Sequence, residues 1–524
     1  MSQSTPLSSS NINLLPPVDA PLSPIQRLAP ETLSDIFSYA VDVNTFEAGS
    51  GAGSISEATL LTQVCSSWRR VAIDTAEIWA PISVKVDFRQ SPSEGVVDAI
   101  QDHLLRSKCS PLSLQISVIF PNHGSEVYSL ESPILDLLLP FLARCRSLHY
   151  TLPPTFTWIY ASHLEKAFQA GFPSLKTLHI DFAPVSTDFD PQFSPKIPRV
   201  LRNFSSSSPN LQNLICTHNH FECDADDDLR FFKSSFQHIT SLQLQTNAFG
   251  AEFVLQCCPS LVSADFILTG DSNWRVFDGM EIGDQLPPPH PSLRKLSIHF
   301  GQNQPEVTFM KPILALLTCP GLESLTLSSS GHRVLHETTQ PGVSGIVKQF
   351  LVRSKITETM ETLEVRGIVL ANLVQLLEMM PKLRYLVIEE LADSKTGSNA
   401  MVTESFMAAL ALSPSLYNIR KISIIAHQYW ENRVLQRWII ALMTRVSAPV
   451  LISIELLQIQ CPSVNVWRLA GELKRQRKLL LTVIVPTEGG RIKYWLVDGT
   501  KVTDRLTAGW QCLGRAQYVE DVNV

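Results

Sequence analysis

The stretch that decides the fold is Phe-Pro-Ser-Leu-Lys-Thr-Leu-His-Ile at residues 172–180, because its pattern returns along most of the chain. In each copy a proline is followed by apolar residues two, five and seven positions later, if Cys216 and Ala264 are counted as apolar. The positions four, six and eight after the proline are mostly polar. This period-two alternation predicts one short strand per copy, with one buried face and one face in water. The prolines are Pro173, Pro209, Pro259, Pro291, Pro320, Pro381 and Pro449.

Apolar helical stretches at 253–258, 313–317, 373–380 and 406–412 come before several of these strands. Proline ends such a helix because it lacks an N–H and disfavours helical geometry in the residue before it. Copies without proline at 239–244 and 360–365, and one at Pro414 that slips to Ile422 and Ile424, fill the gaps. The pattern resembles an irregular leucine-rich repeat. We therefore expect an α/β solenoid over residues 145–460, with a parallel sheet on its concave side and helices on its convex side.

The remaining segments differ in composition from the repeats. Residues 1–23 are rich in Ser, Pro and Asn and are expected to be a disordered leader. Residues 81–144 are expected to link to the solenoid or cap its first repeat. Residues 461–524 are expected to cap its other end, with a helix at 467–473, a strand at 479–485 and a hairpin through Asp498-Gly499 that covers the open sheet edge.

Residues 24–80 predict a small helical unit with two apolar stripes, separated by a Gly/Ser loop at 49–54. The stripes are Leu33, Ile36, Phe37 and Ala40, and then Leu61, Val64, Cys65, Trp68 and Ala72. So small a unit cannot bury all of these side chains by itself. It therefore requires either another layer of the same chain or a partner protein.

This helical unit resembles an F-box. The first half is Leu-Ala-Pro-Glu-Thr-Leu-Ser-Asp-Ile-Phe at 28–37, the second is Val-Cys-Ser-Ser-Trp-Arg at 64–69, and a further tryptophan follows at Trp79. Ala29 stands where the family usually has proline. The resemblance implies that the unit binds the Skp adaptor of a cullin-RING ubiquitin ligase while the repeats hold a target protein, and that Trp79 fastens the unit to the next segment. The adaptor-facing residues, or the core beneath them, would be Leu28, Pro30, Leu33, Ile36, Val64, Cys65 and Trp68.

Overall composition narrows the remaining functions. With 44% apolar residues, 18% charged residues and a net charge of −6, the 524-residue chain can form a large core and does not favour nucleic-acid binding. Charged residues interrupt every apolar run before it reaches the length of a membrane span, so no membrane partner is expected. The ten cysteines form no CxxC pair, which favours a reducing, intracellular compartment, cytoplasmic or nuclear.

One cluster suggests metal chemistry. Cys216-x-His218-x-His220-x-x-Cys223 precedes four aspartates at 224 and 226–228. Structural zinc sites usually separate two ligand pairs by a dozen or more residues, and Cys216 falls at a buried strand position. A metal-dependent enzyme therefore remains only an alternative, and we expect no catalytic residue, metal or cofactor.

The polar, water-facing side of the predicted strands supplies the candidate contacts to a target protein. They are His179, Asp181, Lys295, His299, Tyr385 and Glu389. Two other functions stay open at this point. The chain could act with the Skp adaptor outside ubiquitination, or it could be a repeat-based binding scaffold whose helical hairpin only caps the solenoid.

Overall fold

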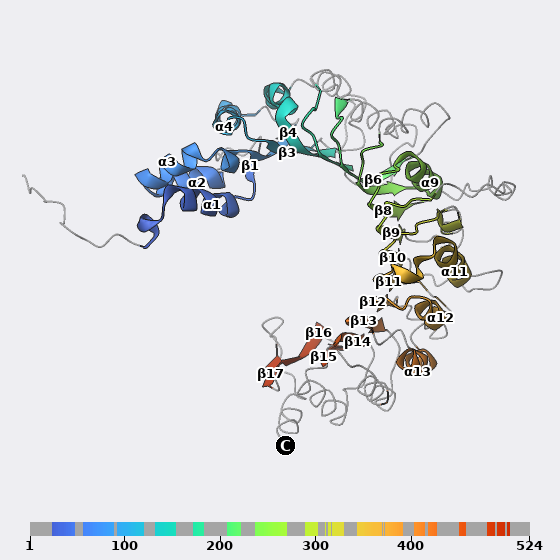
Figure 1. Cartoon of the computed structure of the whole chain (residues 1–524). Coiled ribbons are helices and arrows are strands. Elements are labelled where there is room, and N and C mark those ends of the chain that lie inside the picture. Colours follow the sequence, from blue (N-terminus) through green and yellow to red (C-terminus); the bar gives the residue numbers. More distant parts are fainter. Residues whose placement is uncertain are drawn as a thin grey trace, which may run out of the picture.

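The strands of the protein form one long sheet that curves into an arc. The computed structural model describes residues 24–47, 56–87, 92–119, 132–152, 171–182, 207–221, 236–269, 289–301, 310, 313–315, 317–329, 343–368, 370, 372–390, 403–413, 418–426, 437, 450–456, 479–487, 490–497 and 500–503. Within these residues seventeen strands belong to the same sheet. Figure 1 shows the sheet along the inside of the arc and the helices outside it. The expected α/β architecture, a parallel sheet on the concave side with helices on the convex side, is confirmed.

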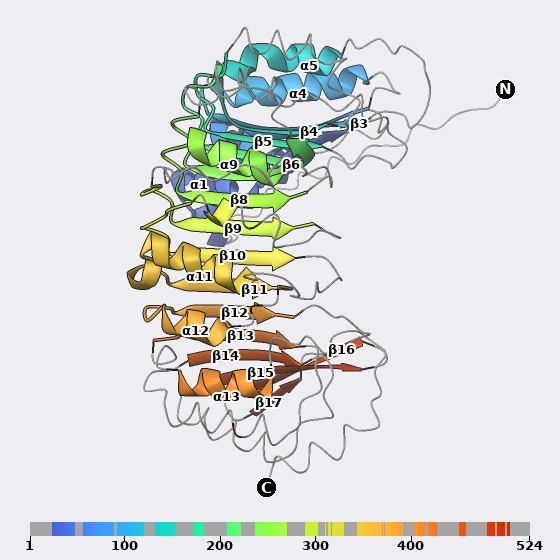
Figure 2. The same cartoon turned by 90° about the vertical axis from the view of Figure 1, so that its right-hand side faces the viewer.

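The strands pair in chain order. Neighbours from β1 to β15 are parallel, and β16 and β17 are antiparallel (Figure 2). They are β1 (Asn44–Glu47), β2 (Pro81–Asp87), β3 (Leu112–Ile119), β4 (Cys145–Leu152), β5 (Thr177–Phe182), β6 (Asn213–Phe221), β7 (Ser241–Thr246), β8 (Ser263–Leu268), β9 (Lys295–Phe300), β10 (Ser324–Ser329), β11 (Thr362–Arg366), β12 (Tyr385–Glu389), β13 (Lys421–Ala426), β14 (Val450–Leu456), β15 (Leu479–Thr487), β16 (Gly490–Val497) and β17 (Thr500–Thr503).

The helices are short and fall into two groups. An N-terminal group comprises η1 (Pro24–Arg27), α1 (Pro30–Ala40), α2 (Glu57–Val64), α3 (Ser66–Asp74) and η2 (Ala76–Trp79). The others lie between strands of the solenoid: α4 (Glu94–Arg106), α5 (Pro133–Leu138), η3 (Leu139–Arg144), α9 (Ala248–Cys257), α11 (Val343–Ser354), η7 (Ile356–Glu358), α12 (Leu373–Glu378) and α13 (Glu404–Leu412). The stretches predicted at 253–258, 373–380 and 406–412 lie within or overlap α9, α12 and α13.

From β1 to β13, the inward-facing residues of the strands belong to one continuous core between sheet and helices. On β7, β8 and β10 buried and half-buried residues alternate strictly, as the sequence pattern predicts. In-register residues such as Leu178, Leu214 and Leu242 are all buried, and they stack as rows across neighbouring strands. Stacking of this kind explains why one unit could not hold its helix and strand together alone.

The solenoid is longer than expected at both ends. Residues 81–144, expected as a linker or cap, contain β2, β3, α4 and α5 and belong to the same core. These strands lack the proline phrase, so the repeat pattern did not predict them. The parallel sheet also continues past residue 460 through β15.

Two details near the C-terminal end concern register. The slipped copy behaves as expected, because Ile422 and Ile424 align with Leu386 and Ile388. In the Pro449 copy, Ile452 aligns with Ile422, so this copy is displaced by two residues from the others.

The expected hairpin is present as β16 and β17, with Val497 opposite Thr500. The expected leader, the Gly/Ser loop at 49–54 and the helix at 467–473 lie outside the described residues.

The second apolar stripe of the helical unit forms two helices and not one. Cys65 has φ −159° and ψ 171°, so the chain is extended between α2 and α3. Its Sγ accepts a hydrogen bond from the Trp68 N–H at 3.5 Å and caps α3. Cys65 therefore caps α3 in the place where Ser, Thr or Asp is usual, and it also lies within the apolar stripe.

Asn44 joins the helical unit to the first strands. Its side chain is fully buried, and Nδ2 donates to the carbonyl oxygens of Ile78 at 2.8 Å and Pro81 at 3.0 Å. Its Oδ1 accepts from the N–H of Ala58 at 3.2 Å. One amide therefore satisfies three backbone groups from α2, η2 and β2.

We expect Asn44→Ala to lower the free energy of unfolding by about 1–3 kcal/mol, because it leaves buried backbone groups without partners. Chemical denaturation followed by tryptophan fluorescence measures this change. Asp42→Ala is the matched control, since the Asp42 side chain is exposed. Equal stability of the two variants would contradict the role given to Asn44.

Candidate protein interfaces

The helical unit has a closed core of its own. Leu33 and Phe37 of α1 pack against residues of α3 and η2, and Trp68 adds a tilted contact to Phe37 with ring centroids 5.0 Å apart. The buried members are Leu33, Phe37, Val41, Ala58, Val71, Ala72, Ile78 and Trp79. The helices therefore do not need their remaining apolar side chains to stay packed.

Large apolar side chains nevertheless remain exposed on α1 and α2. On α1 the exposed fractions are 43% for Ile36 and 93% for Tyr39, and on α2 they are 48% for Leu60 and 59% for Val64. We call these four residues the helical apolar face. Exposed apolar side chains gathered on one small unit are typical of surfaces that bind another protein.

The seven residues predicted for the adaptor face separate into three groups. Ile36, Val64 and Pro30 are exposed, while Leu28, Cys65 and Trp68 are half-buried. Leu33 is only 3% exposed and belongs to the core, because it points from α1 toward α3.

Sequence reasoning missed Tyr39 as a candidate contact and did not select Leu60. Both positions carry a helical signal, since Tyr39 follows Ile36 by three residues and Leu60 precedes Val64 by four. The helical spacing alone could have identified them.

Trp79 fixes this unit to the solenoid, as the sequence predicted. The indole is fully buried, and its Nε1–H donates to the Ala72 carbonyl at 2.7 Å. His103 of α4 meets the ring edge-on at 4.7 Å, and the Arg106 guanidinium lies 4.7 Å from the ring centroid. The indole therefore contacts both the helical unit and the first solenoid helix.

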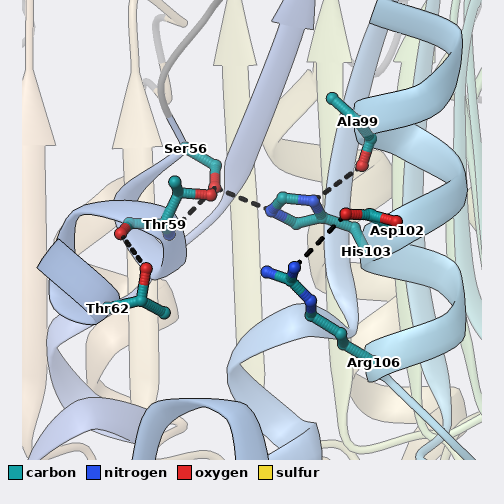
Figure 3. A network of polar contacts seen from close by, with 7 residues as sticks. All are labelled: Ser56, Thr59, Thr62, Ala99, Asp102, His103 and Arg106. Carbon is teal, nitrogen blue, oxygen red and sulfur yellow. Dashed lines mark hydrogen bonds and ion pairs between the residues drawn. The ribbon is translucent and has the colours of Figure 1, made fainter. Parts of the chain in front are cut away.

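A buried hydrogen-bonded pair strengthens the same junction (Figure 3). Ser56 Oγ lies 2.7 Å from His103 Nε2, and His103 Nδ1 lies 2.8 Å from the Ala99 carbonyl oxygen. Since a carbonyl only accepts, Nδ1 carries the proton and the Ser56 hydroxyl donates to Nε2. Burial is the main cause that lowers the pKa of His103 to about 4. The imidazole is therefore neutral at pH 7, and Ser56 also caps α2 through the Thr59 N–H.

The concave face is the second large surface. Its side chains form rows because neighbouring strands are in register, for example Lys295 beside Ser324 and Asp181 beside Thr217. Most of the residues in these rows on β2 to β11 are Ser, Thr, Asn or Gln. The concave face is therefore rich in hydroxyl and amide groups.

The six predicted target contacts lie on this face in three separate pairs. His179 and Asp181 are on β5, Lys295 and His299 on β9, and Tyr385 and Glu389 on β12. With neighbouring strands about 4.8 Å apart, β5 lies roughly 19 Å from β9, and β9 lies roughly 14 Å from β12 along the sheet. The structure therefore distributes the six residues over an extended face and does not bring them into one site.

The N-terminal pair lies in a polar network. The ring of His179 stacks on His149 of β4, with centroids 3.9 Å apart and planes 4° from parallel. Burial lowers the pKa of both imidazoles, and the neighbouring Asp181 carboxylate opposes this change. The Thr217 hydroxyl donates to Asp181 at 2.8 Å.

Among the described residues, the pair on β12, Tyr385 and Glu389, lies beside an ion-pair network and not beside histidines. Glu389 forms an ion pair with Arg366 at 3.3 Å, and Arg366 also contacts Glu364 at 3.1 Å. Tyr385 is exposed, as is Lys295 on β9.

His299 lies between Asp265 and Ser328 on adjacent strands, an order found in nucleophilic catalysis. His299 Nδ1 is 2.6 Å from Ser328 Oγ, and Nε2 is 3.0 Å from Asp265 Oδ1 without hydrogen-bond alignment. The row holds the His299 imidazole between side chains of the two neighbouring strands. The backbone N–H groups of these central strands are occupied by the sheet.

The cysteine and histidine cluster gives no metal site in the part of the chain that the structure describes. Cys216 is buried on β6, and burial raises the pKa of its thiol to about 12, which disfavours the thiolate that a metal needs. The side chains of His218 and His220, and residues 222–230, lie outside the described set. Among the described helices, none has the length and apolar character needed to cross a bilayer.

Comparison with known proteins adds no further assignment. No protein-family model matches the chain, and no curated protein sequence matches it. The function therefore has to be argued from the two surfaces described above.

Proposed function

We propose that the protein is a substrate receptor of a Skp-cullin-F-box type ubiquitin ligase, and not itself an enzyme. In this proposal the helical apolar face binds the Skp adaptor, and the concave face binds a target protein. The other ligase subunits carry the chemistry, and the receptor accelerates transfer by holding the target close to them.

The observation that carries the proposal is the exposure of Ile36, Tyr39, Leu60 and Val64 on a unit whose core is already closed. A helical pair that served only to cap the solenoid would gain stability by turning such residues inward. The motif halves at 28–37 and 64–69, which resemble an F-box, include Ile36 and Val64, and Tyr39 and Leu60 lie within four residues of them. Trp79, His103 and Asn44 support the proposal because they fix the unit to one end of the arc, away from the concave centre.

The decisive experiment compares two double variants with equal changes in charge. Leu60→Asp with Val64→Asp alters the helical apolar face, while Leu105→Asp with Val352→Asp alters similarly exposed apolar residues on α4 and α11. We expect the purified chain to bind purified Skp adaptor. The first pair should weaken binding about 100-fold or more, because carboxylates would be desolvated at the interface centre. Calorimetry measures the affinities, and thermal melts check that both variants fold.

Two results would reject the proposal. The wild-type chain could fail to bind the Skp adaptor, or both double variants could bind it as well as the wild type. Either result would favour the scaffold reading, in which the helical unit is only a cap. Ubiquitin transfer in a reconstituted ligase then tests whether a bound adaptor serves ubiquitination.

A further inference from the structure

The concave face changes character between β11 and β13. On β6 and β8 a single isoleucine, Ile215 or Ile267, interrupts the hydroxyl and amide rows. On β12 and β13 the six residues in these rows include two apolar side chains, Val387 and Ile425, and the exposed Tyr385, with Glu389 in register with Ile425. Apolar side chains therefore gather at one place on a face that is otherwise polar.

Cations border the same place. Arg384 and Arg420 precede β12 and β13, and the Arg420 N–H donates to the Arg384 carbonyl at 2.7 Å, so the two residues are neighbours. Lys421 follows Arg420 and is in register with Tyr385. We call Arg384, Tyr385, Val387, Arg420, Lys421 and Ile425 the β12–β13 patch.

Among the described residues, one of the three cations in the patch has a carboxylate partner. Arg384 lies 3.3 Å from Glu361. Arg420 and Lys421 are exposed and form no ion pair among the described residues. Two positive charges thus remain available at this point of a chain whose net charge is −6.

The chemistry of the patch indicates its ligand. Exposed tyrosine and arginine are the side chains that most often dominate protein interfaces. Apolar neighbours exclude water when a ligand binds, and charge pairs at the border then become stronger. Two or three cations are too few for a nucleic-acid backbone on an acidic chain, but they complement the side chains of an acidic peptide segment.

We propose that the β12–β13 patch binds an acidic segment of the target protein that also carries one large apolar side chain. Glutamate or aspartate side chains of the segment pair with Arg420 and Lys421, and the apolar side chain packs on Tyr385, Val387 and Ile425. Lys421 is in register with Tyr385, and Val387 lies two residues further along β12, between Tyr385 and the level of Ile425. An extended segment therefore has its acidic and apolar residues about two positions apart. This inference deepens the proposed function and rests on it.

A matched pair of variants on the same row tests the assignment. Arg420→Glu with Lys421→Glu reverses the charge of two exposed cations in the patch. Arg146→Glu with Lys176→Glu makes the same charge change on β4 and just before β5. These two cations are also exposed and adjacent, but they lie near His149 and His179 and not near the patch. Tyr385→Ser removes the aromatic ring alone.

The probe is a short synthetic peptide with glutamates flanking one phenylalanine, labelled for fluorescence anisotropy with the full chain. We expect saturable binding that weakens about tenfold or more in Arg420→Glu with Lys421→Glu, and changes little in Arg146→Glu with Lys176→Glu. Binding should also weaken in the Tyr385→Ser variant and when serine replaces phenylalanine in the peptide. High salt should weaken it as well, because salt screens the charge pairs.

Three results would overturn the inference. They are the absence of saturable binding, equal loss in the two charge-reversed variants, and equal binding of a peptide with lysines in place of glutamates. Skp adaptor binding is measured on the same samples. If the patch variants still bind the adaptor but no longer bind the peptide, the result supports the patch as the peptide site. If the wild type binds the peptide but not the adaptor, only the ligase role is rejected.

Discussion

Trp79→Ala is expected to lower the free energy of unfolding by about 3–5 kcal/mol, the largest effect of any single substitution proposed for this protein. The indole is fully buried at the junction, and its removal leaves a cavity between η2 and α4. It also removes the hydrogen bond to Ala72, the edge contact with His103 and the contact with the Arg106 guanidinium. Denaturant unfolding measures the loss, and amide hydrogen exchange shows whether α1, α2 and α3 lose protection before the solenoid does.

Tyr39→Ala provides the contrast for this experiment. Its ring is 93% exposed, so stability should change by no more than about 0.5 kcal/mol. Under the proposed function, however, Tyr39→Ala weakens Skp adaptor binding without loosening the helices. Equal stability of Trp79→Ala and wild type would show that the indole does not hold the junction.

Acidification is expected to destabilise the same junction through His103. Its pKa is lowered to about 4 in the folded protein, mainly by burial, with Arg106 also lowering it and Asp102 and the Ala99 carbonyl opposing this. In the unfolded chain the pKa returns to about 6.5. The unfolded state therefore binds the proton first, and the stability contributed by neutral His103 is present above about pH 6.5 and is lost as the pH falls toward 4.

The expected loss over this range is about 3 kcal/mol, since one pKa unit corresponds to about 1.4 kcal/mol. Protonation also removes the acceptor at Nε2 that the Ser56 hydroxyl uses. Free energies of unfolding of wild type and His103→Gln, measured from pH 7 to pH 4, isolate this residue because the other titrations are common to both. Parallel pH profiles would show that His103 does not carry the effect.

Within the repeats, the recurring phrase was sufficient to predict the strands, the buried rows and the sides on which sheet and helices lie. It also placed Lys295, His299, Tyr385 and Glu389 on the concave face. The reason is that period-two alternation and a proline stop act within one repeat, where sequence neighbours are also structural neighbours.

The extent of the solenoid was not predictable in this way. The strands β2 and β3 lack the proline phrase, and β1 is only four residues long between two helices. Their assignment depends on pairing with neighbours that are already folded. The role proposed for Arg420 and Lys421 was not predicted from the sequence, since their copy slips register after Pro414.

Local sequence therefore determined which residues of this protein are strands, which side chains turn inward and where a small apolar helical unit begins. Only the tertiary structure decided that Leu33 is core while Ile36, Tyr39, Leu60 and Val64 stay exposed, that Ser56 meets His103, and which cations find a carboxylate. Those outcomes depend on contacts between residues tens of positions apart, and such contacts exist only after the chain has packed.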